Sequence, residues 1–248
     1  MKIEQKRIAL FCDILRALVP ECRLMITESG ISVLAVDTAN VGMVSVRLPY
    51  TCFEEFGIHA DGKFDNLEVG MDVEKWKTAI ALMKAAPLTI TQDPSTKKIT
   101  FSDGLYTYTH VPLDPTTIRK RPTIPGIQLP AAIAVDAKEL AETIRAMGVV
   151  GDKVRIRSRG DNLVLDTEGD TDRLQKDLNG ETVGKIITDP VSSLFSLDYL
   201  REVTKVMRMA GKITVCCGQD HPIRFDFEID GMECSYLLAP RIESDGGQ

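Results

Sequence analysis

The side chains that could carry metal or nucleophilic chemistry are few and poorly spaced for it. The three histidines lie far apart, and the six cysteines include no C-x-x-C pair. Cys216, Cys217 and His221 are close in sequence, but adjacent residues of a strand point to opposite faces. The acidic segment 166–172 lacks the ligand spacing and the final glutamate of an EF-hand loop. We therefore expect no metal, no cofactor and no catalytic centre, and we interpret the cysteines as buried free thiols.

Lysine and arginine form the one pattern that points to a chemistry. A line of four cations at i, i+4, i+7 and i+11 begins at Arg201 and continues along a helix opposite its apolar face. Cations without interleaved aromatic rings suit contact with phosphates, which is independent of base sequence and sensitive to salt. The alternative is that they only solvate the outer face of a helix. The candidate phosphate-facing residues are Lys6, Arg16, Lys75, Lys77, Lys84, Arg145, Arg201, Lys205, Arg208 and Lys212.

Four amphipathic helices are expected to position these cations. Apolar residues recur with helical spacing from near residues 6, 72, 136 and 197, so the helix starts are 66, 64 and 61 residues apart. Asp72, Asp136 and Asp198 stand at or near the last three starts, where a carboxylate stabilises a helix N-terminus. A regular repeat should place all four helices on one side of the sheets, and the cations would then share one face.

The sign of the charge depends on which part of the chain is counted. The whole chain carries a net charge of −6. The expected helical segments 6–18, 72–84, 136–147 and 197–212 carry +2, +1, −1 and +2, which leaves −10 for the remainder. Segment 136–147 fits this scheme least well. An acidic protein can still present a basic face to a polyanion, because a local field can oppose the net charge.

Strand-like segments follow the helices and repeat after about half the chain. Segments 23–48 and 154–178 match each other, with Gly30 and Gly160 at corresponding turns. We therefore predict an α+β fold of two similar domains in which helices pack on antiparallel sheets. The predicted limits are residues 1–113 and 131–248, joined by an extended, proline-rich connector at 114–130. The alternative for this connector is a solvated linker without function.

Composition limits the remaining classes. The chain has 44% hydrophobic and 27% charged residues, as expected of a folded protein. No apolar run approaches the roughly 20 residues needed to cross a bilayer, and charges occupy the N-terminal stretch where a signal peptide would be apolar. We expect a cytosolic or nuclear protein with no membrane partner. The sequence has no helix-turn-helix, zinc-finger, RNA-recognition or nucleotide-binding motif, which favours non-specific duplex binding without catalysis.

Three segments resemble the proliferating cell nuclear antigen (PCNA) family of sliding clamps. Residues 30–48 (GISVLAVDTANVGMVSVRL) are similar to the first-domain strands and central loop of that family. Residues 113–130 (LDPTTIRKRPTIPGIQLP) resemble the interdomain connector, especially of archaeal members, and residues 235–243 (SYLLAPRIE) resemble the C-terminal signature. The resemblance covers nearly the whole chain, and the first fifteen residues are its least typical part.

The resemblance implies the DNA clamp fold and a homotrimeric ring, with sheets outside and helices lining the hole. The basic lines would then face duplex DNA. Strand 105–113 of one subunit would pair with about 171–178 of the next, which would cover two sheet edges that are otherwise a risk for aggregation. The implied interface residues are Leu105, Tyr106, Tyr108, His110, Arg173, Leu174, Lys176 and Leu178.

The resemblance also implies a DNA polymerase processivity factor, not an enzyme, that tethers replication and repair proteins. Its partners would be DNA polymerase, the clamp loader, flap endonuclease, ligase and other proteins with a PCNA-interacting peptide. The implied location is the cytoplasm, with the nucleoid, in an archaeon and the nucleus in a eukaryote. The implied peptide pocket contains Val36, Met43, Ile124, Pro125, Leu129, Pro222, Ala239, Pro240 and Ile242.

Two alternatives remain open from the sequence. Some relatives assemble as heterotrimers, so the chain is either one subunit of a mixed ring or the sole subunit of a homotrimer. An enzyme with a site in the crevice between the repeats is the alternative from another class. It would need a convergent set of titratable groups, and no such set is visible in the sequence.

Overall fold

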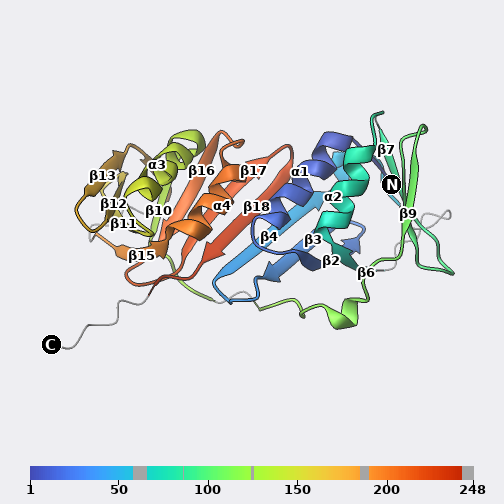
Figure 1. Ribbon diagram of the computed structural model, residues 1–248, viewed down its shortest axis with the longest axis horizontal. Helices are drawn as coiled ribbons and strands as arrows, with labels where there is room; N and C mark the ends of the chain where they lie inside the picture. The colour runs from blue at the N-terminus through green and yellow to red at the C-terminus, as the bar shows by residue number, and fades with distance from the viewer. Residues whose placement is uncertain (58–65, 86, 124–125, 185–189, 242–248) are drawn as a thin grey trace. The chain divides into compact units, whose positions relative to one another are not determined.

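The repeated amphipathic pattern forms four α-helices in the computed structural model, which describes residues 1–57, 66–85, 87–123, 126–184 and 190–241 (Figure 1). The helices are α1 (Gln5–Arg16), α2 (Val73–Leu82), α3 (Ala137–Val150) and α4 (Leu197–Met207). Their starts confirm the predicted ones to within one residue. Asp72 and Asp136 cap α2 and α3, because each carboxylate accepts a backbone N–H of the first turn, at 3.0 and 2.7 Å.

All four observed helix ends differ from the ends of the predicted segments, by two to five residues, and two of these differences place predicted cations outside a helix. Helix α2 ends at Leu82, because Pro87 follows closely and Asp103 accepts the next backbone N–H groups, those of Lys84 and Ala85. Helix α4 ends at Met207, and the chain makes a tight turn through Gly211 into a strand. Arg208 is therefore the C-cap of α4, while Lys84 and Lys212 lie beyond their helices.

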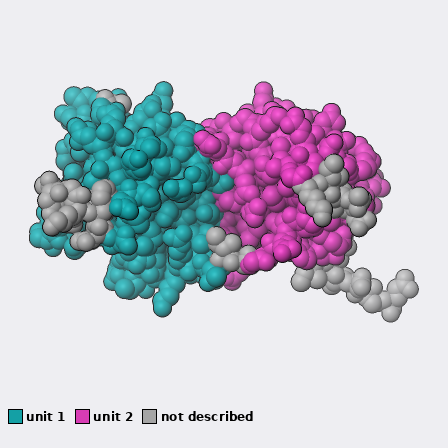
Figure 2. All heavy atoms as spheres, turned by 180° about the vertical axis from the view of Figure 1, so that it is seen from behind, with its two compact units in different colours: residues 1–36, 44–123, 230–234 teal, residues 37–43, 124–229, 235–248 magenta. Residues whose placement is uncertain are grey.

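The described residues divide into two compact units (Figure 2). The first consists of Met1–Val36, Val44–Thr123 and Asp230–Cys234, and the second of Asp37–Met43, Ile124–Ile229 and Ser235–Gln248. Each unit therefore includes a short segment from the half of the chain that supplies most of the other. The predicted division after residues 113 and 130 remains a proposal.

In the first unit, α1 packs beside α2, and both lie on one face of an antiparallel sheet (Figure 1). Within this unit the strands of this sheet follow the order β4-β3-β2-β6, and a second sheet has the order β5-β1-β7-β8-β9. The strands are β1 (Lys2–Ile3), β2 (Glu21–Thr27), β3 (Gly30–Val36), β4 (Gly42–Pro49), β5 (Phe53–Glu55), β6 (Leu67–Asp72), β7 (Leu88–Gln92), β8 (Ile99–Ser102) and β9 (Thr107–His110). Short 3-10 helices span Tyr50–Cys52 and Pro115–Thr117.

The second unit repeats this plan with α3 beside α4. Its strands follow the orders β14-β10-β16-β17-β18 and β13-β12-β11-β15. They are β10 (Ala131–Asp136), β11 (Lys153–Arg159), β12 (Asn162–Glu168), β13 (Arg173–Leu178), β14 (Glu181–Thr182), β15 (Ser192–Ser196), β16 (Lys212–Cys217), β17 (Ile223–Ile229) and β18 (Met232–Leu238). The hairpins β2–β3 and β11–β12 both turn through two residues, since Thr27 pairs with Gly30 and Arg159 with Asn162.

The helices bury their apolar stripes against the sheets of their own unit. Phe11 of α1 and Trp76 of α2 are almost fully buried in the first unit, as are Leu200 and Met207 of α4 in the second. All six cysteines are free and buried, and burial raises the pKa of several of these thiols. Among the described residues, no helix has the length and apolar character of a membrane span.

Candidate nucleic-acid interface and protein-binding sites

A charged groove lies between α3 and α4 in the second unit. Its volume is about 460 Å³. Each helix turns its apolar stripe to the sheet, which leaves its polar residues to line the groove. The lining residues are Ala141, Glu142, Arg145, Arg201, Glu202, Thr204, Lys205 and Arg208.

Arg201 is held across this groove. Its Nη2 donates a hydrogen bond to the carbonyl oxygen of Gly148 on α3, and its Nη1 lies 3.7 Å from Asp198. Gly148 permits the approach, because a Cβ at this position would lie 1.8 Å from Nη2 of Arg201. The guanidinium is therefore fixed in the lining of the groove, where its remaining N–H groups can donate to an anion.

Acidic residues moderate the other cations of the groove. Lys205 forms an ion pair with Glu202 at 2.5 Å, and Glu142 stands one helical turn before Arg145. Arg145, Lys205 and Arg208 are exposed. Cations beside acids on an open surface suit phosphate contacts that form and break readily.

The observed helix bounds change the predicted distribution of charge. Helices α3 and α4 each contain two basic and two acidic residues, so each is electrically neutral. The predicted charge of +2 for the last helical segment came from Arg208 and Lys212, which lie outside α4, and the predicted −1 for the third came from the capping Asp136. Lys212 starts β16 and pairs with Glu181 of β14 at 3.1 Å, so it does not extend the helical line.

In the first unit, two of the cations predicted to contact phosphates form ion pairs between α1 and α2. Arg16 of α1 pairs with Glu74 of α2, and Lys77 of α2 pairs with Asp13 of α1. Lys75 lies 3.6 Å from Asp72 at the start of α2. Lys6 and Lys84 are exposed, the first on α1 and the second after the end of α2.

The predicted joining strands are both sheet edges among the described residues. Strand β9 ends one sheet of the first unit, and β13 ends one sheet of the second. The predicted strand 105–113 is shorter than expected, because Asp103 accepts the backbone N–H groups of Leu105 and Tyr106 and holds them in the β8–β9 turn. These two side chains are 74% and 50% exposed.

The two edges differ in chemistry. On β9, Tyr108 and His110 lie side by side and His110 stacks on Phe101 at 5.8 Å between ring centroids. On β13, Arg173 is exposed, Leu174 is half-buried and Lys176 pairs with Glu139 at 3.0 Å. The predicted interface residue Leu178 is only 1% exposed, so its side chain belongs to the core.

Three segments predicted to share a peptide pocket converge in the second unit. The backbone N–H of Ala239 donates to the carbonyl of Val41 at 2.8 Å, which joins the C-terminal segment to the central loop. The backbone N–H of Arg241, in the C-terminal segment, donates to the carbonyl of Leu194 in β15 at 2.7 Å. The backbone N–H of His221, next to Pro222, donates to Oγ of Ser193, also in β15, at 3.1 Å.

Five of the predicted pocket residues, from these segments and the connector, are half-buried. They are Met43, Leu129, Pro222, Ala239 and Pro240. Val36 ends β3 and belongs to the first unit. The remaining predicted pocket residues, Ile124, Pro125 and Ile242, lie outside the described residues.

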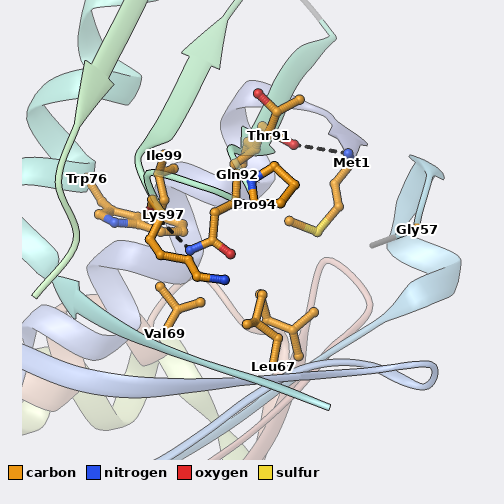
Figure 3. Close-up of a pocket in the computed structure, with 12 residues that line it drawn as sticks. Met1, Gly57, Leu67, Val69, Trp76, Thr91, Gln92, Pro94, Lys97 and Ile99 are labelled. Carbon is orange, nitrogen blue, oxygen red and sulfur yellow. Dashed lines mark hydrogen bonds between the residues drawn. The ribbon is translucent and has the colours of Figure 1, made fainter. Parts of the chain in front are cut away.

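An apolar cavity of about 320 Å³ lies in the first unit (Figure 3). Its walls include Leu67, Val69, Trp76 and Ile99. Polar groups at its rim are engaged with the chain itself: the terminal amine of Met1 donates to the carbonyl of Ile90 at 3.0 Å, and the Gln92 amide donates to Lys97 at 3.1 Å. We assign no ligand to this cavity.

Known proteins match the chain over almost its full length. The family model described as the proliferating cell nuclear antigen C-terminal domain matches residues 123–242. DNA polymerase sliding clamps of Methanospirillum hungatei and Methanoculleus marisnigri are 38% and 41% identical to this chain over 238 residues, which is 94% of both chains in each case. The structure of A. fulgidus PCNA bound to the C-terminal region of FEN-1 aligns with a TM-score of 0.84, 29% identity and 98% coverage of both chains.

The architecture of helix pairs on antiparallel sheets, with these matches, defines the class as a DNA clamp. The predicted α+β clamp fold is thus confirmed, and PCNA from Entamoeba histolytica shares it at 18% identity and a TM-score of 0.83. The chain belongs to the proliferating cell nuclear antigen family of DNA polymerase sliding clamps, as the sequence resemblance indicated.

Proposed function

We propose that three copies of this chain close into a ring around duplex DNA and tether DNA polymerase and other replication and repair proteins to it. The observation that carries the proposal is the likeness to curated DNA polymerase sliding clamps across 94% of both chains. The chain acts as a binding platform and not as an enzyme. A tethered polymerase would gain processivity because the tether raises its effective concentration at the primer end.

Subunits would join edge to edge through β9 of one copy and β13 of the next. Their places at the ends of their sheets support this pairing, since each presents backbone groups to a new strand. The joint would be heterologous, and three such joints would close a ring. Tyr108 and His110 would meet Arg173, Leu174 and Lys176 of the neighbour, with Leu105 and Tyr106 at its margin.

The groove between α3 and α4 would face the DNA. Arg145, Arg201, Lys205 and Arg208 supply donors to phosphates, while Glu142 and Glu202 keep the net attraction low. A sliding clamp needs this balance, because strong localised binding would hold the ring at one place. Lys6 and Lys84 are the first-unit candidates for the same role, with Arg16, Lys75 and Lys77 weakened by their ion pairs.

Partners would insert a short peptide with a glutamine and apolar and aromatic anchors beside the central loop and the C-terminal segment. The FEN-1 complex of the archaeal neighbour supports a flap endonuclease among them. We extend the proposal to DNA polymerase, ligase and a clamp loader, which would supply the energy for ring opening. Because the curated relatives are archaeal, we place the clamp in the cytoplasm with the DNA.

Retention on circular DNA tests the topological part of this proposal. The protein is loaded by its clamp loader onto nicked circular DNA, and half of the sample is then cut once with a restriction enzyme. A ring should stay on the intact circle through gel filtration and slide off the linear form. Equal retention on the two forms would contradict encirclement, and a bulky block at both ends of the linear DNA should restore retention.

Light scattering distinguishes the homotrimer from a mixed ring. The purified chain should have a mass near three times 27.4 kDa if it assembles with itself. A monomer that reaches this mass only when mixed with paralogous chains would favour the heterotrimer.

A further inference from the structure

A buried carboxylate links the central loop of the second unit to helix α4. Asp37 is 7% exposed. Its Oδ1 accepts the backbone N–H groups of Val41 and Gly42 at 2.8 and 2.9 Å, and its Oδ2 accepts the hydroxyl hydrogen of Tyr199 at 2.5 Å. The two residues of this last bond are 162 positions apart in sequence.

Asp37 holds the loop in one conformation. Its own N–H donates to the carbonyl of Gly42 at 2.9 Å, so the main chain closes on itself around the carboxylate. Asn40 takes a left-handed conformation, with φ of 59°, at the tip of this turn. Val41 then presents its carbonyl to Ala239 of the C-terminal segment. One carboxylate therefore determines the position of a loop to which the C-terminal segment is attached.

Tyr199 anchors that carboxylate to a rigid element. The tyrosine lies in the first turn of α4, whose apolar stripe is packed in the core. A hydroxyl bonded to a carboxylate makes a stronger hydrogen bond than a neutral pair does. The bond to Asp37 raises the pKa of Tyr199 to about 12. Without the Tyr199 hydroxyl, Oδ2 of the buried Asp37 carboxylate would lose its hydrogen-bond donor in α4, and such a loss is costly in free energy.

We propose that Tyr199 is a positioning residue of the partner-peptide pocket: through Asp37 it fixes the loop Asp37–Met43 against the C-terminal segment in the shape that a partner peptide recognises. The inference rests on the proposed function of the loop and deepens it. Met43 ends this loop and Ala239 pairs with it, and both are predicted to contact the peptide. If the loop adopts its binding conformation only part of the time, its apparent affinity for the peptide falls in proportion to the population of that conformation.

The test is Tyr199→Phe, which removes one oxygen and keeps the packed ring. The probe is a fluorescent peptide of the C-terminal region of FEN-1, and its affinity is measured by anisotropy on the full-length protein. We expect Tyr199→Phe to bind three- to tenfold more weakly than wild type. Amide hydrogen exchange at Val41 and Gly42 should accelerate by a similar factor.

Thr167→Val is the matched control. This substitution also removes a buried hydroxyl from the second unit. The Thr167 hydroxyl donates to the carbonyl of Lys153 at 2.7 Å, and in the described residues it makes no hydrogen bond to the loop Asp37–Met43. This variant should bind the peptide like wild type. If both variants weaken binding equally, the effect is general destabilisation and the inference is overturned.

A double-mutant cycle gives the second criterion. Once Asp37→Ala has removed the acceptor, Tyr199→Phe should cause no further loss of affinity, whereas independent losses would overturn the inference. Unchanged affinity in Tyr199→Phe would overturn the inference alone. Failure of the wild-type protein to bind the peptide would overturn the proposed partner pocket, and this inference with it.

Discussion

The helix pairs of the two units follow one plan but use their charges differently. Between α1 and α2, Arg16 and Lys77 pair with acids of the facing helix. Between α3 and α4, Arg201 instead bonds to a backbone carbonyl and Lys205 to an acid of its own helix, and the groove between them is lined by four cations and two acids. The two halves of the repeat thus share their arrangement of helices and strands but not their surface charges. We expect phosphate contacts to be stronger in the second unit.

Equivalent hairpins differ in the same way. Gly30 does not lie in its turn as Gly160 does: it follows the turn as the first residue of β3, where its φ is 129° and a Cβ would lie 2.2 Å from the carbonyl oxygen of Leu48 in β4. The turn β11–β12 contains Gly160 at φ of 57°, with open space where a Cβ would be. The first glycine is required by packing as well as by its backbone conformation, and the second by its backbone conformation alone.

The largest expected effect is on stability. Gly30→Ala should lower the free energy of unfolding by about 3–5 kcal/mol, because backbone atoms must move to admit the methyl group. Gly160→Ala should cost only about 1–2 kcal/mol, the usual penalty of a left-handed non-glycine residue. Urea denaturation of each variant measures both values. Similar losses in the two would show that the hairpins are equally constrained.

The next effect concerns the groove between α3 and α4. Lys205→Glu with Arg208→Glu should weaken binding of duplex DNA by more than about tenfold and reduce its salt dependence, since two cations proposed to contact phosphates become anions. Fluorescence anisotropy with a short duplex at low salt measures the loss, and light scattering checks that the oligomer is intact.

Lys97→Glu with Lys98→Glu is the control for that variant. It changes the net charge equally, but on an exposed turn between β7 and β8 of the first unit. It should alter DNA affinity by less than about twofold. If both double variants weaken binding alike, net charge and not the groove determines affinity.

Much of this arrangement could be predicted from local sequence. The apolar periodicity located each helix start, whereas the two edge strands came from the family resemblance. Helix ends were harder, because Lys212 continues the helical spacing of Arg201 by coincidence while Gly211 and the alternating strand after it end the helix. The Asp37–Tyr199 bond could not be found, since its residues lie 162 positions apart and only folding brings them together.

A smaller difference in DNA affinity is expected between removing a cation from α3 and removing one from α2. Arg145→Ala in the groove should weaken DNA binding by about three- to fivefold. Lys77→Ala should weaken it by less than about twofold, because Asp13 already neutralises the lysine. The same anisotropy assay ranks the two variants. A greater loss in Lys77→Ala would reverse the comparison and place the main phosphate contacts in the first unit.

The smallest expected effect is the pH dependence of stability that comes from the edge strand β9. His110 of β9 is half-buried, and within the described residues neither ring nitrogen has a hydrogen-bond partner. Burial, and then the nearby Lys75, lower the pKa of His110 below its usual 6.5, although Asp72 opposes this. The unfolded chain therefore binds the proton more readily than the folded protein does. Stability should fall as the pH drops from about 6.5 through the lower pKa of the folded state.

His110→Phe tests this origin, because it keeps a ring to stack on Phe101 and cannot be protonated. Thermal unfolding at pH 7.5 and pH 5 should show that wild type loses more stability than the variant, by less than about 1 kcal/mol because His110 as a whole is only half-buried. Equal losses would mean that other groups cause the acid sensitivity. β13 contains no histidine, so a histidine-dependent contribution at the two edges should come from β9.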